Sequence, residues 1–496
     1  MKAPLLTFGG LDFLVLGLFF IAILALGFSV KLRDHSVLQF LAAGRKLTLP
    51  LFVASLVILW YGDILGTGES VATFGIGTWI LFGVPYYIFA IIYALFLSDK
   101  VRKAEQISIP ERLHLRYGKA VALIGAVLLF LLAVPTAHAL SIGVLIQSFT
   151  GWERWFCVII GVVVGASFLY KGGLLADARV SLLAFLMMYI SFLTIAIWCL
   201  AHYPLMETIS KIGDKNLLKW DGGTGVLYVI SLFIVGAWTL VDPGFHQRVA
   251  SAESPATSKK GLYISVAFWL FFDLLSITTA MYAIALYPNV QGLDVYPAFS
   301  QQILPSGLKA LFFCGMLGTA ISALVAYALI SGATIGREII ARARPGMDDQ
   351  AVKLWTRIGI GIACLVAIVL AISIDSIVDL WTAWAGAVIG ALLIPVCAAY
   401  LRNKQLQPTA VFWSIALSFG VAIAWMVYGR THNDAYLELF FSRTETGLKV
   451  VLANSSANAP VQEGTKISIG TLMPGLFVSA LVIALGTGIS KIRSHA

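Results

Sequence analysis

Residues 54–69 read ASLVILWYGDILGTGE, so that two carboxylates and three glycines interrupt an apolar stretch long enough to cross a bilayer. A carboxylate at the centre of a membrane helix costs about 2.5–3.5 kcal/mol on insertion scales, so such residues normally face a cavity or a partner. Gly62, Gly66 and Gly68 are poor helix formers, and unwound backbone at membrane depth is tolerated only where it is buried in protein or lines a water-filled cavity. The stretch therefore predicts a broken helix that lines a binding site, with Asp63 as a functional candidate.

The composition of the chain is that of a polytopic membrane protein. Hydrophobic residues make up 59% of the 496 residues, charged residues make up 12%, and the mean hydropathy is +0.90. Soluble proteins are about one quarter charged. Apolar runs of about 20 residues predict an all-α fold with about 13 transmembrane helices. These runs are centred near Gly17, Leu59, Ile88, Leu131, Val162, Tyr189, Phe233, Phe271, Leu317, Val366, Ile389, Val421 and Ala480.

The basic residues predict the orientation of the chain. With the N-terminus outside, the basic clusters within 31–46, 100–119, 248–260, 337–344 and 491–493 fall in the cytoplasm, as the positive-inside rule expects. The C-terminus is then cytoplasmic, and topology accounts for the net charge of +9 without a nucleic-acid partner. The first apolar stretch is longer than a signal-peptide core, so we expect it to be retained. The short tails favour a bacterial inner membrane, and we expect a monomer.

No residue pattern favours an enzyme. The five cysteines lie in apolar runs without paired spacing, and the seven histidines lack metal-ligand spacing. The sequence contains no phosphate-binding glycine loop and no ordered nucleophile and base. We therefore expect neither catalytic residues nor a cofactor.

A second interrupted span lies five spans after the first. Residues 226–241 carry Gly236 and Trp238 and run into Asp242-Pro243-Gly244. Inverted-repeat transporters place broken helices at corresponding positions of two five-helix halves and bind solute where the breaks meet. The pattern predicts one transmembrane domain over 1–496. Its parts are a first span and cytoplasmic loop (1–46), two inverted repeats (47–201 and 224–401), and two C-terminal spans (408–496) with an external loop (430–470).

Five motifs follow one another along the chain. They are FLAAGR at 40–45, SIPER at 108–112 with RYG at 116–118, YKGGL at 170–174, DPG at 242–244 with Gln247 and Arg248, and GLKA at 307–310. In this order they resemble the sodium/solute symporter family, which includes sodium-coupled sugar, proline and sialic acid transporters. The resemblance implies thirteen spans with an external N-terminus, a leucine-transporter-like core of two inverted five-helix repeats, and ion-coupled uptake by alternating access.

The resemblance also implies a sodium site. In the family the ion lies between carbonyls at the first break and a carbonyl plus two adjacent hydroxyls in the ninth span. The matching positions here are Ile58, Tyr61, Thr319, Ser322 and Ala323. Sodium is a hard cation that prefers oxygen ligands, and Ala323 lacks the hydroxyl usual in the family. We therefore expect Na⁺ as the coupling ion, with H⁺ as the alternative.

The sixth span departs from the family pattern in a second way. Val180-Ser181 replaces the usual Thr-Asp, and Asp177 lies one helical turn earlier. A second sodium site is therefore not expected. Asp177, Ser181 and Asp273 are retained as candidates for an ion relay.

Each acidic candidate has a structural alternative. Asp63 could ligate sodium, carry a proton or face a cationic solute, or it could cap the second half of the broken helix. Glu69 is either a ligand or a vestibule residue. Asp273 either faces the cavity or is protonated and bonded to a neighbouring helix. His138 is either a packed histidine or a proton relay.

Aromatic residues lie near both breaks and suit an organic cation, a sugar or a flat heterocycle. An interfacial aromatic belt is the alternative for Trp381 and Trp384. Sugar is disfavoured because Ile64 and Leu65 occupy positions where sugar-transporting members carry polar ligands. The substrate-binding candidates are Trp60, Gly62, Asp63, Glu69, Trp238, Asp242, Trp381 and Trp384.

These observations predict a sodium-driven symporter of a small polar organic solute. The alternatives are a proton-coupled transporter of an organic cation or amino acid, and a transporter-like solute sensor. The expected partners are the solute, the coupling ion and the lipid bilayer.

Overall fold

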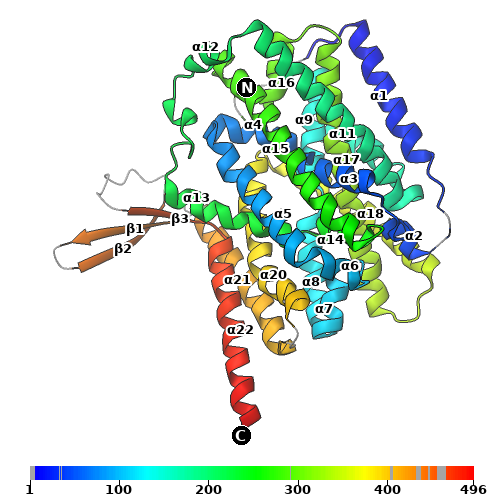
Figure 1. The fold of residues 1–496 in the computed structure, drawn as a ribbon, viewed down its shortest axis with the longest axis vertical. Helices are drawn as coiled ribbons and strands as arrows, with labels where there is room; N and C mark the ends of the chain where they lie inside the picture. Colours follow the sequence, from blue (N-terminus) through cyan, green and yellow to red (C-terminus); the bar gives the residue numbers. More distant parts are fainter. Residues whose placement is uncertain are drawn as a thin grey trace.

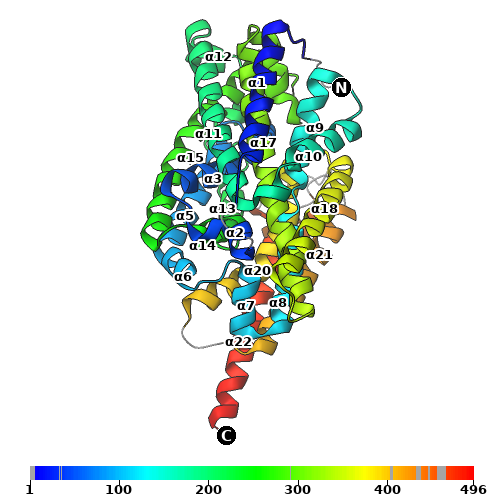
Figure 2. The ribbon, with the colours of Figure 1, turned by 90° about the vertical axis from the view of Figure 1, so that its right-hand side faces the viewer.

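Eleven helices in the described part of the chain are long and apolar enough to cross a membrane. A computed structural model describes residues 6–32, 34, 36–290, 292–402, 406–431, 437–444, 447–454 and 465–495. Two shorter apolar helices, Arg154–Ala166 and Leu472–Thr487, occupy the other two positions at which spans were predicted. The chain is thus a multi-pass membrane protein, and its helices form one bundle with the described N-terminal end and the C-terminus at opposite ends (Figures 1 and 2).

The first broken helix is where the sequence predicts it. Its first half, α3 (Leu49–Trp60), carries a proline in its first turn and gives way to a 3₁₀ turn, η2 (Tyr61–Asp63), before the second half, α4 (Ile64–Phe74), begins. A Cβ atom on Gly62 would lie 2.1 Å from the Cβ of Ala323. The glycine is therefore required because the break is pressed against the helix that carries Ala323.

The second broken helix repeats this design. It consists of α13 (Val226–Phe233), the 3₁₀ segment η5 (Ile234–Leu240) and α14 (Pro243–Ser251). Asp242 starts α14 as its N-cap, because its Oδ1 accepts a hydrogen bond of 2.9 Å from the backbone N–H of Phe245.

The remaining helices surround these two. Before the first break are α1 (Gly10–Phe28), α2 (Val37–Ala42) and η1 (Ala43–Arg45). Between the breaks are η3 (Trp79–Gly83), α5 (Val84–Phe96), α6 (Ser98–Lys103), α7 (Ile109–Tyr117), α8 (Lys119–Ala133), α9 (Thr136–Thr150), α10 (Arg154–Ala166), α11 (Leu169–His202), α12 (Leu205–Ser210) and η4 (Lys215–Leu218). After the second break are α15 (Pro255–Leu286), η6 (Gly292–Asp294), α16 (Val295–Ile303), α17 (Leu308–Ala333), η7 (Thr334–Ala341), α18 (Asp349–Ser373), α19 (Ile377–Asp379), η8 (Leu380–Ala385), α20 (Gly386–Leu401), α21 (Pro408–Thr431) and α22 (Leu472–His495).

The centre of the bundle is α17. In the span formed by α17 and η7, 94% of the residues of the most apolar 18-residue window are buried, compared with 28% in α1 at the edge. A helix that is apolar on all sides belongs in the core. Asp12 of α1 fixes the edge helix to this core, because its carboxylate accepts hydrogen bonds from Ser306 and from the N–H groups of Gly307 and Ala310 at the start of α17.

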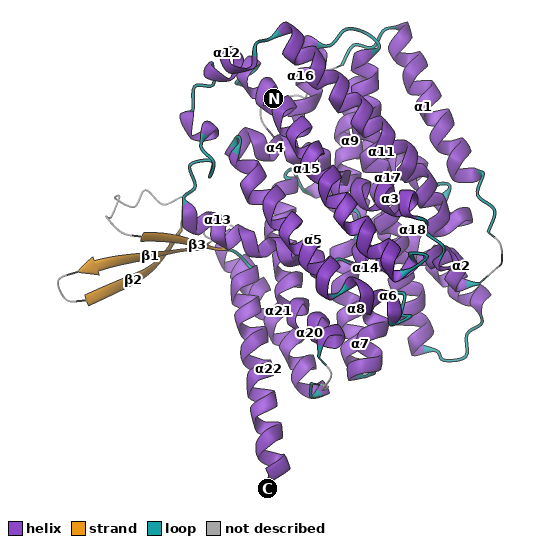
Figure 3. Ribbon diagram, viewed as in Figure 1, coloured by secondary structure: helices purple, strands orange, loops and turns teal. Residues whose placement is uncertain are grey.

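The external loop predicted over 430–470 contains a sheet that the sequence pattern did not predict. Strands β1 (Leu437–Thr444), β2 (Gly447–Asn454) and β3 (Thr465–Ile469) pair antiparallel in the order β2-β1-β3. The sheet projects from one side of the helical bundle (Figure 3). Residues 432–436, 445–446 and 455–464 of the predicted loop lie outside the described ranges.

Candidate functional site

A cavity of about 900 Å³ lies where the two broken helices meet. Its wall includes Trp60, Tyr61 and Asp63 at the first break and Trp238 at the second. Residues of η3, α5, α8, α9, α15, α17 and α18 to α20 complete it. A mid-membrane cavity at two helix breaks is the arrangement in which inverted-repeat transporters bind solute and ion.

Asp63 is held between two helices. Nε1 of Trp381 donates a hydrogen bond of 2.9 Å to Oδ2 of Asp63, and Nδ1 of His138 lies 2.5 Å from Oδ1. Neither that oxygen nor that nitrogen has another hydrogen-bond partner among the described residues. The carboxylate makes no bond to the first turn of α4, so in this structure it does not cap that helix.

His138 connects Asp63 to the second break. Its ring stacks on the ring of Tyr327 in α17, with centroids 5.2 Å apart, and the Tyr327 hydroxyl donates a 2.9 Å hydrogen bond to Oδ2 of Asp242. The indole N–H of Trp238 donates to the same oxygen over 3.0 Å. Tyr327 was missed in the sequence because nothing in its neighbourhood along the chain distinguishes it from other aromatic residues in apolar spans.

Asp273 of α15 also lines the cavity and is hydrogen-bonded as well. Oδ1 lies 2.8 Å from the hydroxyl of Tyr61, and the Tyr87 hydroxyl donates to Oδ2. The same Tyr61 oxygen lies 2.8 Å from the carbonyl oxygen of Trp269. The two alternatives for Asp273, cavity wall and bonded partner of a neighbouring helix, thus describe one arrangement.

Three of the predicted substrate ligands lie behind the cavity wall. Glu69 accepts bonds from the backbone N–H groups of Ile377 (3.0 Å) and Val378 (3.4 Å), so it holds the start of α19. Asp242 is buried beneath Trp238, and Gly62 packs against α17. The lining residues include Trp60, Asp63, Trp238, Trp381 and Trp384.

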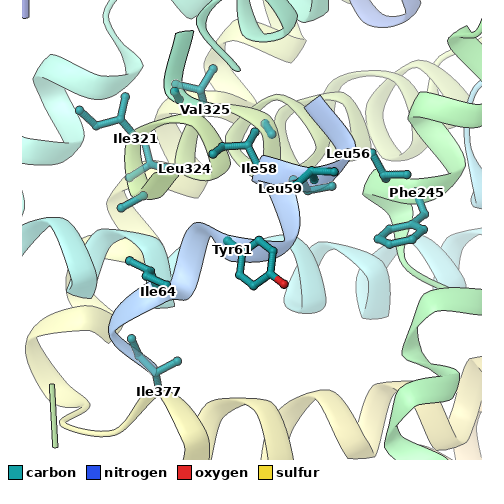
Figure 4. Packing of buried hydrophobic residues seen from close by; sticks show 14 of the residues in the cluster. Leu56, Ile58, Leu59, Tyr61, Ile64, Phe245, Ile321, Leu324, Val325 and Ile377 are labelled. Atoms are coloured by element: carbon teal, nitrogen blue, oxygen red, sulfur yellow. The ribbon is translucent and has the colours of Figure 1, made fainter. Parts of the chain in front are cut away.

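The first break packs against α17, the helix that carries the candidate sodium ligands Thr319 and Ser322. Figure 4 shows Ile58 on the side of Ile321, Leu324 and Val325, whereas the Tyr61 hydroxyl points away from them. The Thr319 hydroxyl donates to the Met316 carbonyl over 2.6 Å. The group of Thr319 that the family resemblance implies as a sodium ligand is its carbonyl and not this hydroxyl.

Ser322 joins the candidate sodium site to α11. Its hydroxyl lies 2.7 Å from that of Ser181, which lies 3.4 Å from Oδ1 of Asp177. The other carboxylate oxygen of Asp177 is 2.6 Å from the guanidinium of Arg248, and both side chains are fully buried. Asp177 therefore has a resident counter-charge in Arg248.

The end of the bundle at α7 is closed by charged side chains. Arg337 of η7 donates to both carboxylate oxygens of Glu111 over 2.8 and 3.0 Å and to Glu338 over 2.8 Å. Ser108 also donates to Glu338, over 2.6 Å. The cavity reaches the surface at the other end, where the side chain of Asp375 is 88% exposed.

Comparison with known proteins agrees with this geometry. Residues 40–414 match the sodium:solute symporter family. A curated relative, sodium/glucose cotransporter 4 of Danio rerio, is 21% identical over 494 residues, which cover 85% of this chain and 72% of the relative.

Solved structures show that the fold is leucine-transporter-like. A Na⁺-coupled sialic acid symporter in a substrate-bound outward-open state superposes with a TM-score of 0.76 at 14% identity over 98% of both chains. Mhp1, a nucleobase-cation-symport-1 family transporter, superposes with a TM-score of 0.53 at 13% identity over 88% of this chain and 91% of its own.

Proposed function

Because this chain belongs to the sodium:solute symporter family, we propose that it couples sodium entry to uptake of a small polar organic solute bound in the cavity at the two helix breaks. Family membership supports sodium-coupled symport itself and excludes an enzyme. The observation that carries the solute site is the position of the first break, which lines the cavity and also packs against α17, the helix of Thr319 and Ser322.

The sodium site in this proposal uses oxygen atoms at the first break and on α17. The ligands are the carbonyls of Ile58, Tyr61 and Thr319 and the hydroxyl of Ser322. Ala323 has no hydroxyl, so the ion is held by fewer protein ligands than is usual in the family. Sodium at this position would tie the break to α17 and so fix Asp63 and Trp60 in the cavity wall.

In this proposal the two ends of the bundle open in turn, as alternating access requires. The cavity opens at Asp375, while the Glu111, Arg337 and Glu338 network closes the end at α7. With the N-terminus outside, as the basic residues predict, this is an outward-open conformation. Transport then requires the cavity to close at the Asp375 end once solute and sodium are bound. The network at the α7 end must open afterwards.

The test is uptake into proteoliposomes. The purified protein should accumulate a radiolabelled solute when external sodium exceeds internal sodium, and should not when potassium replaces sodium. The solute is chosen first by thermal stability in detergent, because a ligand that binds only the folded state raises its stability. Solute accumulation that is equal in sodium and potassium would overturn sodium coupling.

A proton-coupled transporter of an organic cation or amino acid is the second candidate. The close approach of His138 to Asp63 in the cavity wall favours it, because this pair offers a place for a proton beside the solute. Uptake driven by an inward proton gradient in sodium-free buffer would support this candidate and exclude the first.

A further inference from the structure

The charges around the cavity are unbalanced. Four carboxylates are among the described residues that line it, and these residues include no lysine and no arginine. The acidic residues are Asp63, Asp273, Asp375 and Asp379, and the sole histidine is His138. A low-dielectric cavity lined by charges of one sign concentrates ions of the opposite sign.

The carboxylates at the mouth of the cavity and those deeper inside differ in whether a positively charged side chain pairs with them. At the mouth, Asp375 pairs with Arg154 over 2.5 Å, so its charge is matched in an exposed position. Deeper in the cavity, Asp273 is in contact with tyrosine hydroxyls and forms no ion pair among the described residues. Among the described residues, Asp63 pairs with the imidazole of His138 and with no lysine or arginine.

Several aromatic residues line the same cavity as Asp63. The ring centroids of Trp60 and Tyr86 lie 4.1 Å apart in the cavity wall. Trp238 lines the same cavity at the second break. Trp381 donates its indole N–H to Asp63, which fixes that ring beside the carboxylate. Indole and phenol faces attract cations, and such rings around a carboxylate are a recognition site for a charged nitrogen.

We propose that the solute carries a positively charged nitrogen, a quaternary or protonated amine, which Asp63 faces and which Trp60, Trp238 and Trp381 surround. This inference rests on the proposed function and gives the chemical class of its solute. A purely anionic solute would meet carboxylates without an arginine or lysine to bind it. A neutral polyol could donate hydrogen bonds to the carboxylates, but it would bring no positive charge to balance them.

Matched probes test the charge alone. Choline and 3,3-dimethyl-1-butanol have the same shape, but only choline carries the charge, and protonated butylamine and 1-butanol form a second such pair. In sodium buffer, at least one cation is expected to raise the thermal stability while its neutral partner does not. Stabilisation by sugars, carboxylates or the neutral partners without any cation would overturn the proposal, and so would the absence of stabilisation by every cation.

Substitution of Asp63 tests the site. Asp63→Asn is expected to weaken binding of the stabilising cation about tenfold or more, because a charge-assisted contact is replaced by a neutral one. Asp63→Glu is expected to restore part of it. The control is Glu207→Gln on α12. It removes an exposed carboxylate that pairs with Lys211, and it is expected to leave binding unchanged.

The sodium response separates the two proposals. If Asp63→Asn is still stabilised by sodium, it is folded, and its loss of cation binding then reports on Asp63 itself. If sodium stabilises the wild-type protein but no cation does, the charge proposal fails while sodium coupling stands. If sodium has no effect on the wild-type protein, the proposed function fails, whatever the cations do.

Discussion

Arg248 of α14 and Asp177 of α11 form an ion pair of 2.6 Å in which neither side chain is exposed. The pair joins the second broken helix to the helix that approaches the candidate sodium site through Ser181 and Ser322. Removal of one partner from a buried pair leaves a charge without compensation and costs about 3–5 kcal/mol.

We therefore expect Arg248→Met to lower the free energy of unfolding by about this amount. The double variant Asp177→Asn with Arg248→Met should lose less, because no unpaired charge remains. Unfolding in detergent, followed by circular dichroism, measures both. An equal loss of unfolding free energy in the single and the double variant would show that an unpaired buried charge is not the cause of the destabilisation.

Ser322 is the sharpest test of the sodium site. Ser322→Ala is expected to weaken the apparent sodium affinity about tenfold, equivalent to about 1.4 kcal/mol, because one oxygen ligand is lost. Ser331→Ala is the control, since this buried hydroxyl of the same helix donates to the Ala133 carbonyl over 2.8 Å. Sodium titrations of thermal stability compare the two variants, and an unchanged affinity in Ser322→Ala would remove this residue from the site.

Asp273 should tolerate an amide better than a methyl group. The Tyr61 hydroxyl has one hydrogen but two oxygen neighbours at 2.8 Å, the Trp269 carbonyl and Asp273 Oδ1. The amide of Asp273→Asn can donate to Tyr61 and accept from Tyr87, so this variant should fold normally. Asp273→Ala removes the acceptor of the buried Tyr87 hydroxyl, at about 1–3 kcal/mol, while the Tyr61 hydroxyl keeps the Trp269 carbonyl. Equal thermal stability of the two variants would contradict this account.

The spans and the two breaks could be predicted because each is determined by residues that are close together in the sequence. Apolar runs set the spans, and glycines with Asp63 and with Asp242-Pro243-Gly244 mark the breaks. The contacts of Asp63 with His138 and Trp381 could not be predicted in this way. They depend on how helices distant in sequence are rotated against one another, which hydropathy does not encode.

The same limit applies to the charged residues. Gln247 and Arg248 were quoted as a motif, but their partners, the Leu41 carbonyl and Asp177, lie on other helices. The strands in the predicted external loop were missed for a different reason. Their sequences are short and of mixed polarity, so the alternation typical of a half-buried strand is weak.

Closure at the α7 end should weaken as the pH falls. Burial lowers the pKa of His114 below its ordinary value, and the nearby positive charge of Arg342 lowers it further. If opening restores the ordinary pKa of about 6.5, the open state binds the proton more tightly, so acidification through that range favours opening. The closed state is thus most stable above this range.

Hydrogen exchange of the α7 backbone amides measures this opening. Exchange at each pH is compared with that of His114→Gln, in which the titrating group is absent, so that the intrinsic pH dependence of exchange cancels. Wild-type protein should lose protection relative to the variant as the pH falls. Parallel protection curves would contradict a role for His114.

Gly62 packs tightly against α17 at the first break, and a single methyl group there should disturb the whole site. A Cβ at this position would lie 2.1 Å from the Cβ of Ala323 and 2.9 Å from ring atoms of His138. Gly62→Ala must therefore displace the break, at about 1–3 kcal/mol for overpacking, and with it Tyr61 on one side and Asp63 on the other. Binding of sodium and of solute should be lost together. Gly420→Ala in α21, where an added Cβ meets nothing within 4 Å, should bind both as the wild-type protein does. Retention of either ligand by Gly62→Ala would show that the two sites do not share this break.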